Sequence, residues 1–232
     1  MVENYIEDFY TVSYNGKKAF KSLDEYRRWY FGADECEIRI CVHRAYRDFC
    51  RLLRGIAQNS DKQKWREAVE KYIDKRIKEL LSKTDTDKDN FDIWHKETCE
   101  GILKFSNNSV FRNIPLETYG LAQKWLNMTL KYMIIMGKWE KDMKAIIPFL
   151  HVPVDSYIME AASTELGIML YTKNHEPQPY NKNQSMLWSK WKKYDVYNYF
   201  QEQIAIKLRE KNITPIDWEG PAWIKIAKKR KK

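Results

Sequence analysis

The sequence has few of the features that mark metal-binding, secreted or membrane proteins. Its four cysteines include no Cys-x-x-Cys pair, and the nearest cluster, Cys36, Cys41 and His43, lacks the short paired spacing of zinc or iron–sulfur sites. No run of about 18 apolar residues could span a bilayer. Residues 1–10 carry acidic side chains that do not suit a signal peptide. We therefore expect a cytoplasmic protein with structural thiols, no metal, no cofactor and no membrane partner.

Signals for β-structure are also scarce. Asn15-Gly16 stands between residues 11–14 and 17–20, and this dipeptide readily supplies both positive φ angles of a type I′ turn. We predict a short N-terminal β-hairpin there. The sequence contains no internal repeat and no long low-complexity region.

Helical periodicity covers most of the remaining chain. Ser22 and Glu25 form a capping box at the start of the first helical pattern. Further patterns occupy residues 35–58, 60–82, 91–104, 120–136, 155–166 and 195–211, with a helical turn at 188–191. Residues 175–181 are rich in turn formers, Thr214 begins a last short segment, and the basic tail 228–232 is typical of a disordered, solvated end. We predict an all-α fold with two lobes, residues 1–110 and residues 111–232.

The charge balance favours a polyanionic partner. The 232 residues include 41 Lys and Arg against 32 Asp and Glu, a formal net charge of +9. Aromatic residues make up 14% of the chain, including 9 Trp and 15 Tyr, and could stack on bases or simply fill the core. The 35–58 pattern also carries an arginine face, which is either an ordinary solvated surface or a track for phosphates: Arg39, Arg44, Arg47, Arg51 and Arg54.

Lys124 and Asp155 each fall near the beginning of a predicted helix. Gly120 permits a tight or left-handed turn before the first of these helices. Lys124 then falls in the first turn, where the helix dipole is positive and a lysine is misplaced unless something anionic or reactive compensates it. Pro153 keeps Val152 out of the α region, so Asp155 can cap the second helix by accepting from the N–H groups two or three residues later.

Two short motifs resemble those of the helix-hairpin-helix DNA glycosylases. Gly120-Leu121-Ala122-Gln123-Lys124 is similar to that family's Gly-hydrophobic-Gly-x-Lys hairpin, and Val152-Pro153-Val154-Asp155 is similar to its Val-Pro-Val-Asp approach to the catalytic aspartate. Their order is that of the family, and their 31-residue separation resembles the archaeal 8-oxoguanine glycosylase branch. The resemblance covers residues 117–167, about a fifth of the chain. Ala122 departs from the second hairpin glycine, and Tyr119 from a common proline.

The resemblance implies a two-lobed helix-hairpin-helix glycosylase-like fold, with residues 111–232 as the catalytic lobe. It implies that Lys124 attacks C1′ to form a Schiff base, with AP lyase activity, and that Asp155 stabilises the oxocarbenium ion and acts as base. The substrate would be double-stranded DNA with a flipped base, bound by a monomer. The implied hairpin clamp on a DNA phosphate consists of Gly120, Leu121, Ala122 and Gln123. Base-pocket candidates from the surrounding segments are His151, Trp188, Trp218 and Trp223.

Other interpretations stay open. Asp155 could be only a helix cap and Lys124 only a solvated charge, and the tryptophans and His151 could be core residues. A non-catalytic helical nucleic-acid-binding module, or a protein-interaction bundle, would fit the same helices. The excised base could be 8-oxoguanine, another lesion in DNA repair, or a modified base of invading phage DNA.

Overall fold

The computed structural model describes residues 22–32, 37–50, 53, 62–83, 86–106, 116–172, 174 and 176–231. The expected hairpin at residues 11–20 lies outside them. The α-helices are α2 (Leu23–Phe31), α3 (Ile38–Phe49), α4 (Lys62–Leu81), α5 (Lys88–Ser106), α6 (Tyr119–Met136), α7 (Glu140–Met143), α8 (Ser156–Leu166), α9 (Tyr194–Arg209) and α10 (Pro215–Arg230). Two 3₁₀ helices are η3 (Ile147–Phe149) and η4 (Trp188–Lys190). The predicted all-α character is confirmed for this part of the chain.

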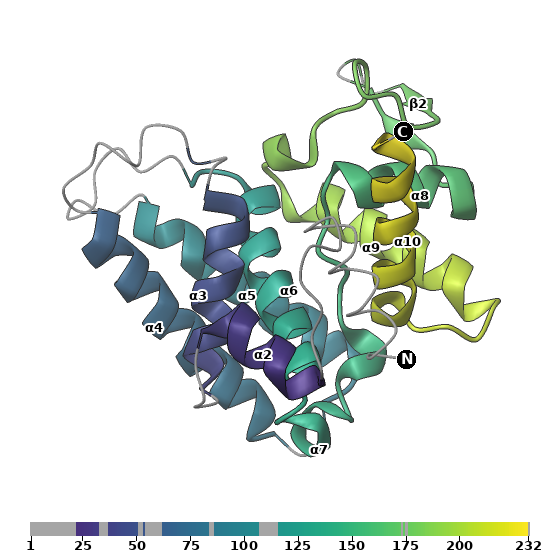
Figure 1. The fold of residues 1–232 in the computed structure, drawn as a ribbon. Coiled ribbons are helices and arrows are strands. Elements are labelled where there is room, and N and C mark those ends of the chain that lie inside the picture. Colours follow the sequence, from purple (N-terminus) through teal and green to yellow (C-terminus); the bar gives the residue numbers. More distant parts are fainter. Residues whose placement is uncertain are drawn as a thin grey trace.

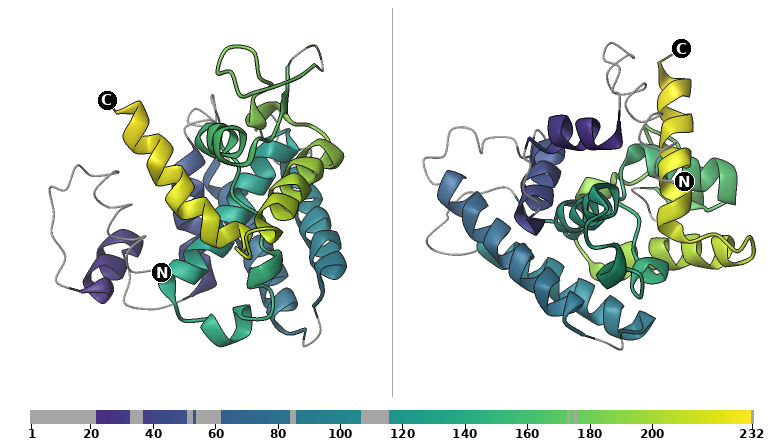
Figure 2. Two further views of the ribbon diagram at one scale, coloured as in Figure 1. Left: turned by 90° about the vertical axis from the view of Figure 1, so that its right-hand side faces the viewer. Right: turned by 60° about the horizontal axis from the view of Figure 1, so that its bottom comes forward.

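Helix α6 is the central element of the fold. Figure 1 shows α3, α4 and α5 on one side of it and α8, α9 and α10 on the other. Nearly every α6 side chain is buried, and one continuous cluster of buried residues joins both sides. The two further views in Figure 2 show the same central position. The division of the chain at residue 110 stays a prediction, because residues 107–115 are not described.

Local capping explains where several helices begin and end. Ser22 Oγ accepts from the Glu25 N–H (3.2 Å) at the start of α2, which confirms the predicted cap. Thr118 caps α6 in the same way, accepting from the Leu121 N–H. Helices α6 and α8 both end in a glycine with positive φ, Gly137 (74°) and Gly167 (67°).

The C-terminal prediction is wrong in one respect. The last segment is not short, because α10 runs for 16 residues and includes Lys228–Arg230, which the sequence analysis assigned to a disordered tail. Arg230 and Lys229 reach Glu160 on α8 with N–O distances of 2.7 and 3.0 Å. This acidic partner, 70 residues away in the chain, fixes the end of α10.

Two other segments differ from expectation. Helix α3 covers Ile38–Phe49, a shorter span than the predicted 35–58. The turn-rich residues 175–181 include strand β2 (Pro177–Gln178), which forms an antiparallel pair with the two-residue strand β1 (Leu170–Tyr171) just before them. Strands this short have no periodicity to detect. None of the described helices combines the length and apolarity needed to cross a membrane.

Gly120 lies inside α6 and does not form a left-handed turn before it. The helix starts at Tyr119. Among the described residues, the glycines with positive φ are Gly32, Gly137 and Gly167, and Gly120 is not one of them. The Gly120 N–H donates to the Trp191 carbonyl (3.0 Å), and an added Cβ would lie 1.9 Å from the Trp188 carbonyl oxygen. Gly120 is therefore required for the close approach of η4. Because the helix starts early, Lys124 is in the second turn of α6 and not in the first.

Gly120→Ala should destabilise the fold by about 1–3 kcal/mol, because the methyl group collides with backbone that cannot rotate away. The matched control is Gly101→Ala in α5, where the obstructing atom is the Tyr72 hydroxyl at the end of a side chain. That change should stay within about 1 kcal/mol of the wild type, since alanine is the better helix former. Urea denaturation measures both. Equal stability of the two variants would contradict the role assigned to Gly120.

Candidate active site

Lys124 and Asp155 meet although 31 residues separate them. The Lys124 ammonium on α6 lies 2.9 Å from Asp155 Oδ2 at the start of α8, and it also donates to the Pro153 carbonyl (3.1 Å). The side chains are 9% and 18% exposed, so the pair is largely shielded from water. The Lys124 amine and the Asp155 carboxylate thus lie together in one partly buried position. The Schiff-base chemistry that the resemblance implies requires such a pair.

The two oxygens of Asp155 have separate partners. Oδ1 accepts from the backbone N–H groups of Tyr157 (2.9 Å) and Ile158 (3.0 Å), which confirms the predicted N-cap. Oδ2 accepts from Lys124 and from the Trp223 indole N–H (3.1 Å). Burial alone would raise the pKa of Asp155, but the Lys124 charge and the hydrogen bonds from Ile158, Lys124 and Trp223 hold this pKa below its usual 3.8. The carboxylate is ionised at neutral pH.

Trp223 is the one base-pocket candidate that contacts the ion pair in the described structure. Its ring stacks on Tyr157 with centroids 5.0 Å apart, next to the indole contact with Asp155. The Arg230 guanidinium lies 4.2 Å from the centroid of the Tyr157 ring and secures the same stack from the end of α10. Helix α10 thereby places the N–H edge of an indole ring against Asp155.

The other candidates lie elsewhere. The Trp218 indole N–H donates to Glu165 (3.1 Å), and Trp188 is buried in η4 against Gly120. His151 contacts Asp92 and Tyr197, with both distances 2.9 Å, so its polar neighbours are not Lys124 and Asp155. Nothing in these contacts gives Trp188, Trp218 or His151 a place beside the ion pair.

Gly120 to Gln123 do not form an exposed hairpin. All four residues are buried, and η4 covers the start of α6. The Gln123 side chain points inward and donates to the carbonyls of Gly120 (2.9 Å) and Val154 (3.2 Å). The expectation that these residues contact a DNA phosphate needs correction, because this surface is covered in the described structure.

The sequence did not indicate a second buried ion pair. Lys131 Nζ lies 2.6 Å from Glu219 Oε2, with side chains 8% and 2% exposed. Lys131 follows Lys124 by seven residues, so both lysines lie on one face of α6, and Glu219 precedes Trp223 by one turn of α10. The spacing of the two lysines was the available signal, but only the packing of α10 identifies the partner.

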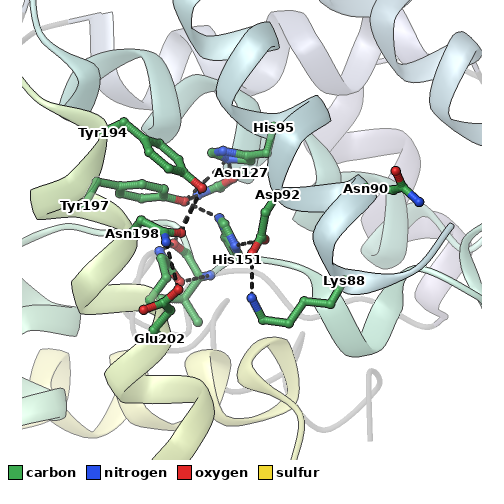
Figure 3. A network of polar contacts seen from close by, with 12 residues as sticks. Lys88, Asn90, Asp92, His95, Asn127, His151, Tyr194, Tyr197, Asn198 and Glu202 are labelled. Atoms are coloured by element: carbon green, nitrogen blue, oxygen red, sulfur yellow. Dashed lines mark hydrogen bonds and ion pairs between the residues drawn. The ribbon is translucent and has the colours of Figure 1, made fainter.

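A buried polar network adjoins the site (Figure 3). Asp92 contacts His151, which contacts the Tyr197 hydroxyl, and Asn127 donates to that hydroxyl (2.8 Å). Asn127 Oδ1 lies 2.8 Å from His95 Nε2. Burial, reinforced by the neighbouring His151, holds the pKa of His95 well below 6.5, so His95 is neutral. Sequence patterns did not reveal this network, because its members come from α5, α6, α9 and the segment between η3 and α8.

The arginine face of α3 lines a separate hollow of about 580 Å³ between α2, α3 and α4. Two arginines of this hollow have structural contacts. The Arg44 guanidinium on α3 lies 3.9 Å from the centroid of the Tyr30 ring and 3.4 Å from Asp48, and Arg66 on α4 lies 3.4 Å from Glu70. Arg51 and Arg54 lie outside the described residues. The question of phosphate tracking along this face stays open.

The described residues contain no group of three or more His, Cys, Asp or Glu side chains placed to hold a metal ion. Cys36 is outside them, and His43 Nδ1 lies 2.8 Å from Glu70. Cys41 and Cys99 are buried free thiols, and burial raises the pKa of Cys99.

Comparisons with protein-family models, with curated proteins and with solved structures find no match.

Asp155→Asn should lower the free energy of unfolding by roughly 1–3 kcal/mol at neutral pH, because asparagine can still cap α8 but leaves Lys124 without its counter-charge. The folded-state pKa of Asp155 lies below 3.8, so its stabilising contribution is complete above that pH and is lost as the pH falls through the folded value. The difference between variant and wild type should therefore shrink in acid.

Urea denaturation from neutral pH down to about pH 3 measures this difference. Asp24→Asn is the control, since the Asp24 side chain is 78% exposed and its contact with Arg27 should contribute little at any pH. A pH-independent difference for Asp155→Asn would show that the charge of Asp155 does not stabilise the fold.

Proposed function

We propose that the protein is a DNA glycosylase with AP lyase activity, which excises a damaged or modified base from double-stranded DNA. The observation that carries the proposal is the 2.9 Å contact between the Lys124 amine and the Asp155 carboxylate at the start of α8. The Lys124 and Asp155 motifs, which resemble those of the helix-hairpin-helix glycosylases, supply this pair of groups, and the contact between them supports their acting together.

Asp155 has the properties needed to stabilise a developing cation. Breaking an N-glycosidic bond leaves positive charge on the sugar, and a fixed carboxylate lowers the energy of that state. Its capping contacts with Tyr157 and Ile158 hold Asp155 in place, and its pKa below 3.8 keeps it charged. The stabilising charge is therefore present before the substrate arrives.

Lys124 supplies the nucleophile in this proposal. The neutral Lys124 amine attacks C1′ while the N-glycosidic bond breaks and the base leaves with the bonding electrons. The amine then gives up a proton, and opening of the C1′–O4′ bond with protonation of O4′ leaves an imine that links Lys124 to the sugar. Asp155 Oδ2 is within hydrogen-bond reach of the amine and can accept its proton. The attack requires Lys124 to release its contacts with Asp155 and the Pro153 carbonyl, so DNA binding must rearrange this pair.

The flipped base would enter between α6 and α10. The indole N–H of Trp223 contacts Asp155 on that side and its ring stacks on Tyr157, while the buried Lys131–Glu219 pair supplies polar groups one to two turns away. Trp223 must shift or receive the base by stacking. The base stays open between 8-oxoguanine, another lesion and a phage-modified base.

A non-catalytic nucleic-acid-binding module is the second candidate. It is favoured by the structural contacts that both residues make, since Asp155 caps α8 and Lys124 binds the Pro153 carbonyl. The formal charge of +9 suits duplex DNA under either function.

Lys124→Gln should abolish covalent trapping by borohydride on a duplex that contains an abasic site, because only an amine can form the imine. An abasic substrate makes the test independent of the unknown base. Lys225→Gln is the matched control: it removes the same charge from a side chain that is 73% exposed. The control should trap like the wild type, and the affinity of both variants for the duplex should be retained.

Excision is then measured on duplexes that carry a panel of modified bases. Asp155→Asn should lower excision by about 10² or more, in line with the loss of other preorganised charges. Trapping by Lys124→Gln at the wild-type rate would refute the nucleophile assignment. Duplex binding without trapping by the wild type would favour the binding module.

A further inference from the structure

The segment that carries Asp155 is extended and buried, yet in the part of the chain that the structure describes it pairs with no strand. Instead, side-chain amides satisfy its backbone. Gln201 on α9 binds both polar groups of Val152: its Oε1 accepts from the Val152 N–H (3.0 Å) and its Nε2 donates to the Val152 carbonyl (2.8 Å). One glutamine thus reproduces the two hydrogen bonds that a neighbouring strand would make.

Gln123 on α6 makes the same pair of contacts two residues later. Its Oε1 accepts from the Val154 N–H (3.3 Å) and its Nε2 donates to the Val154 carbonyl (3.2 Å). Asn127, one turn along α6, donates to Gln123 Oε1 (3.0 Å) and to the Val152 carbonyl (3.2 Å). Gln123, Asn127 and Gln201 are each at most 3% exposed, so water does not compete for these groups.

Lys124 binds the carbonyl between these two positions. Its ammonium donates to Pro153, while the two glutamines hold Val152 and Val154. The residue next to the nucleophile therefore fixes the segment that bears the carboxylate. A slip of the segment by one residue would move Asp155 by about 3.3 Å. Lys124 Nζ and Asp155 Oδ2 lie 2.9 Å apart, and a displacement of that size would break their contact. The contact therefore depends on this register.

The amides are anchored in turn by the network in Figure 3. Asn127 donates to the Tyr197 hydroxyl (2.8 Å), which also contacts His151 immediately before Val152. The amide orientations are thus set from α6 and α9 together.

We propose that Gln123 and Gln201 are positioning residues, which hold residues 152–154 in the register that brings the Asp155 carboxylate to the Lys124 amine. The geometric part stands by itself, and the effect on catalysis rests on the function proposed above. Gln123 then acts through the backbone that leads to Asp155 and not through a DNA phosphate.

The test replaces each glutamine by methionine, which has similar length but neither amide group. Leu208→Ala is the matched control, because Leu208 is fully buried on α9 about two turns beyond Gln201, and its truncation destabilises the core. Thermal melting establishes that the variants fold and ranks their stability.

Two readouts separate positioning from mere stability. The first is the pKa of Asp155, measured by carbon-13 NMR of its carboxyl group. The charged partner facing it is Lys124 from α6, with Trp223 from α10 as a neutral donor. Gln123→Met and Gln201→Met should raise this pKa toward 3.8 as the contact with Lys124 loosens, whereas Leu208→Ala should leave it unchanged.

The second readout is the rate of borohydride trapping on the abasic duplex. The methionine variants should trap about tenfold more slowly or worse, because small displacements of reacting groups carry large rate losses. Their affinity for the duplex should be retained, and the control should trap normally.

Gln201→Glu provides a conservative rescue. A protonated carboxyl can accept from the Val152 N–H and donate to its carbonyl as glutamine does, while an ionised carboxylate cannot donate. The trapping rate of this variant relative to wild type should therefore rise as the pH falls. If Gln201→Met does not fold, Gln201→Glu tests the positioning role of Gln201 in its place.

The outcomes are distinct. An unchanged Asp155 pKa in both methionine variants overturns the positioning role, whatever the trapping shows. Equal losses in Leu208→Ala and in the methionine variants also overturn it, in favour of stability alone. If the wild type does not trap, the proposed function fails, and the Asp155 titration still decides whether the glutamines position the carboxylate.

Discussion

The Asp155 carboxylate is the point on which three helices converge. It caps α8 through Tyr157 and Ile158, receives Lys124 from α6 and receives the Trp223 indole from α10. Each contact alone is an ordinary hydrogen bond, but they share one partly buried charge. Loss of that charge would leave the Lys124 ammonium with only a backbone carbonyl among these contacts. Asp155 thus links the start of α8 to both α6 and α10.

The same contacts that stabilise the fold prepare the site for chemistry. A fixed, ionised carboxylate beside an amine suits a reaction that develops positive charge and then traps it covalently. In the proposed function Lys124 is the nucleophile, but its amine is already engaged by Asp155, and Trp223 closes the side from which a base would enter. Substrate binding would therefore need to exchange internal contacts for contacts with DNA. The extended segment 152–154, held by buried amides, limits how far Asp155 moves during that exchange.

Local chemistry made several features predictable. The Ser22 cap, the Asp155 cap and the helical spans of α4 and α9 follow from residues within one or two turns, whose interactions do not depend on the rest of the chain. Other local inferences failed where packing intervened. Thr118 and the approach of η4 draw Gly120 into α6, which moves Lys124 to the second turn. Glu160 fixes the end of α10, although composition alone predicted a disordered tail there.

The sequence by itself determined which residues could carry the chemistry. Lys124 and Asp155 stand out because proline, capping and helix-dipole effects act over a few residues. Only the tertiary structure decided what surrounds them: that Trp223 and not Trp188 or Trp218 reaches Asp155, that Lys131 pairs with Glu219, and that Gln201 holds Val152. These partners lie 49 to 88 positions apart in the chain. No periodic pattern encodes such distances, because the packing of whole helices sets them.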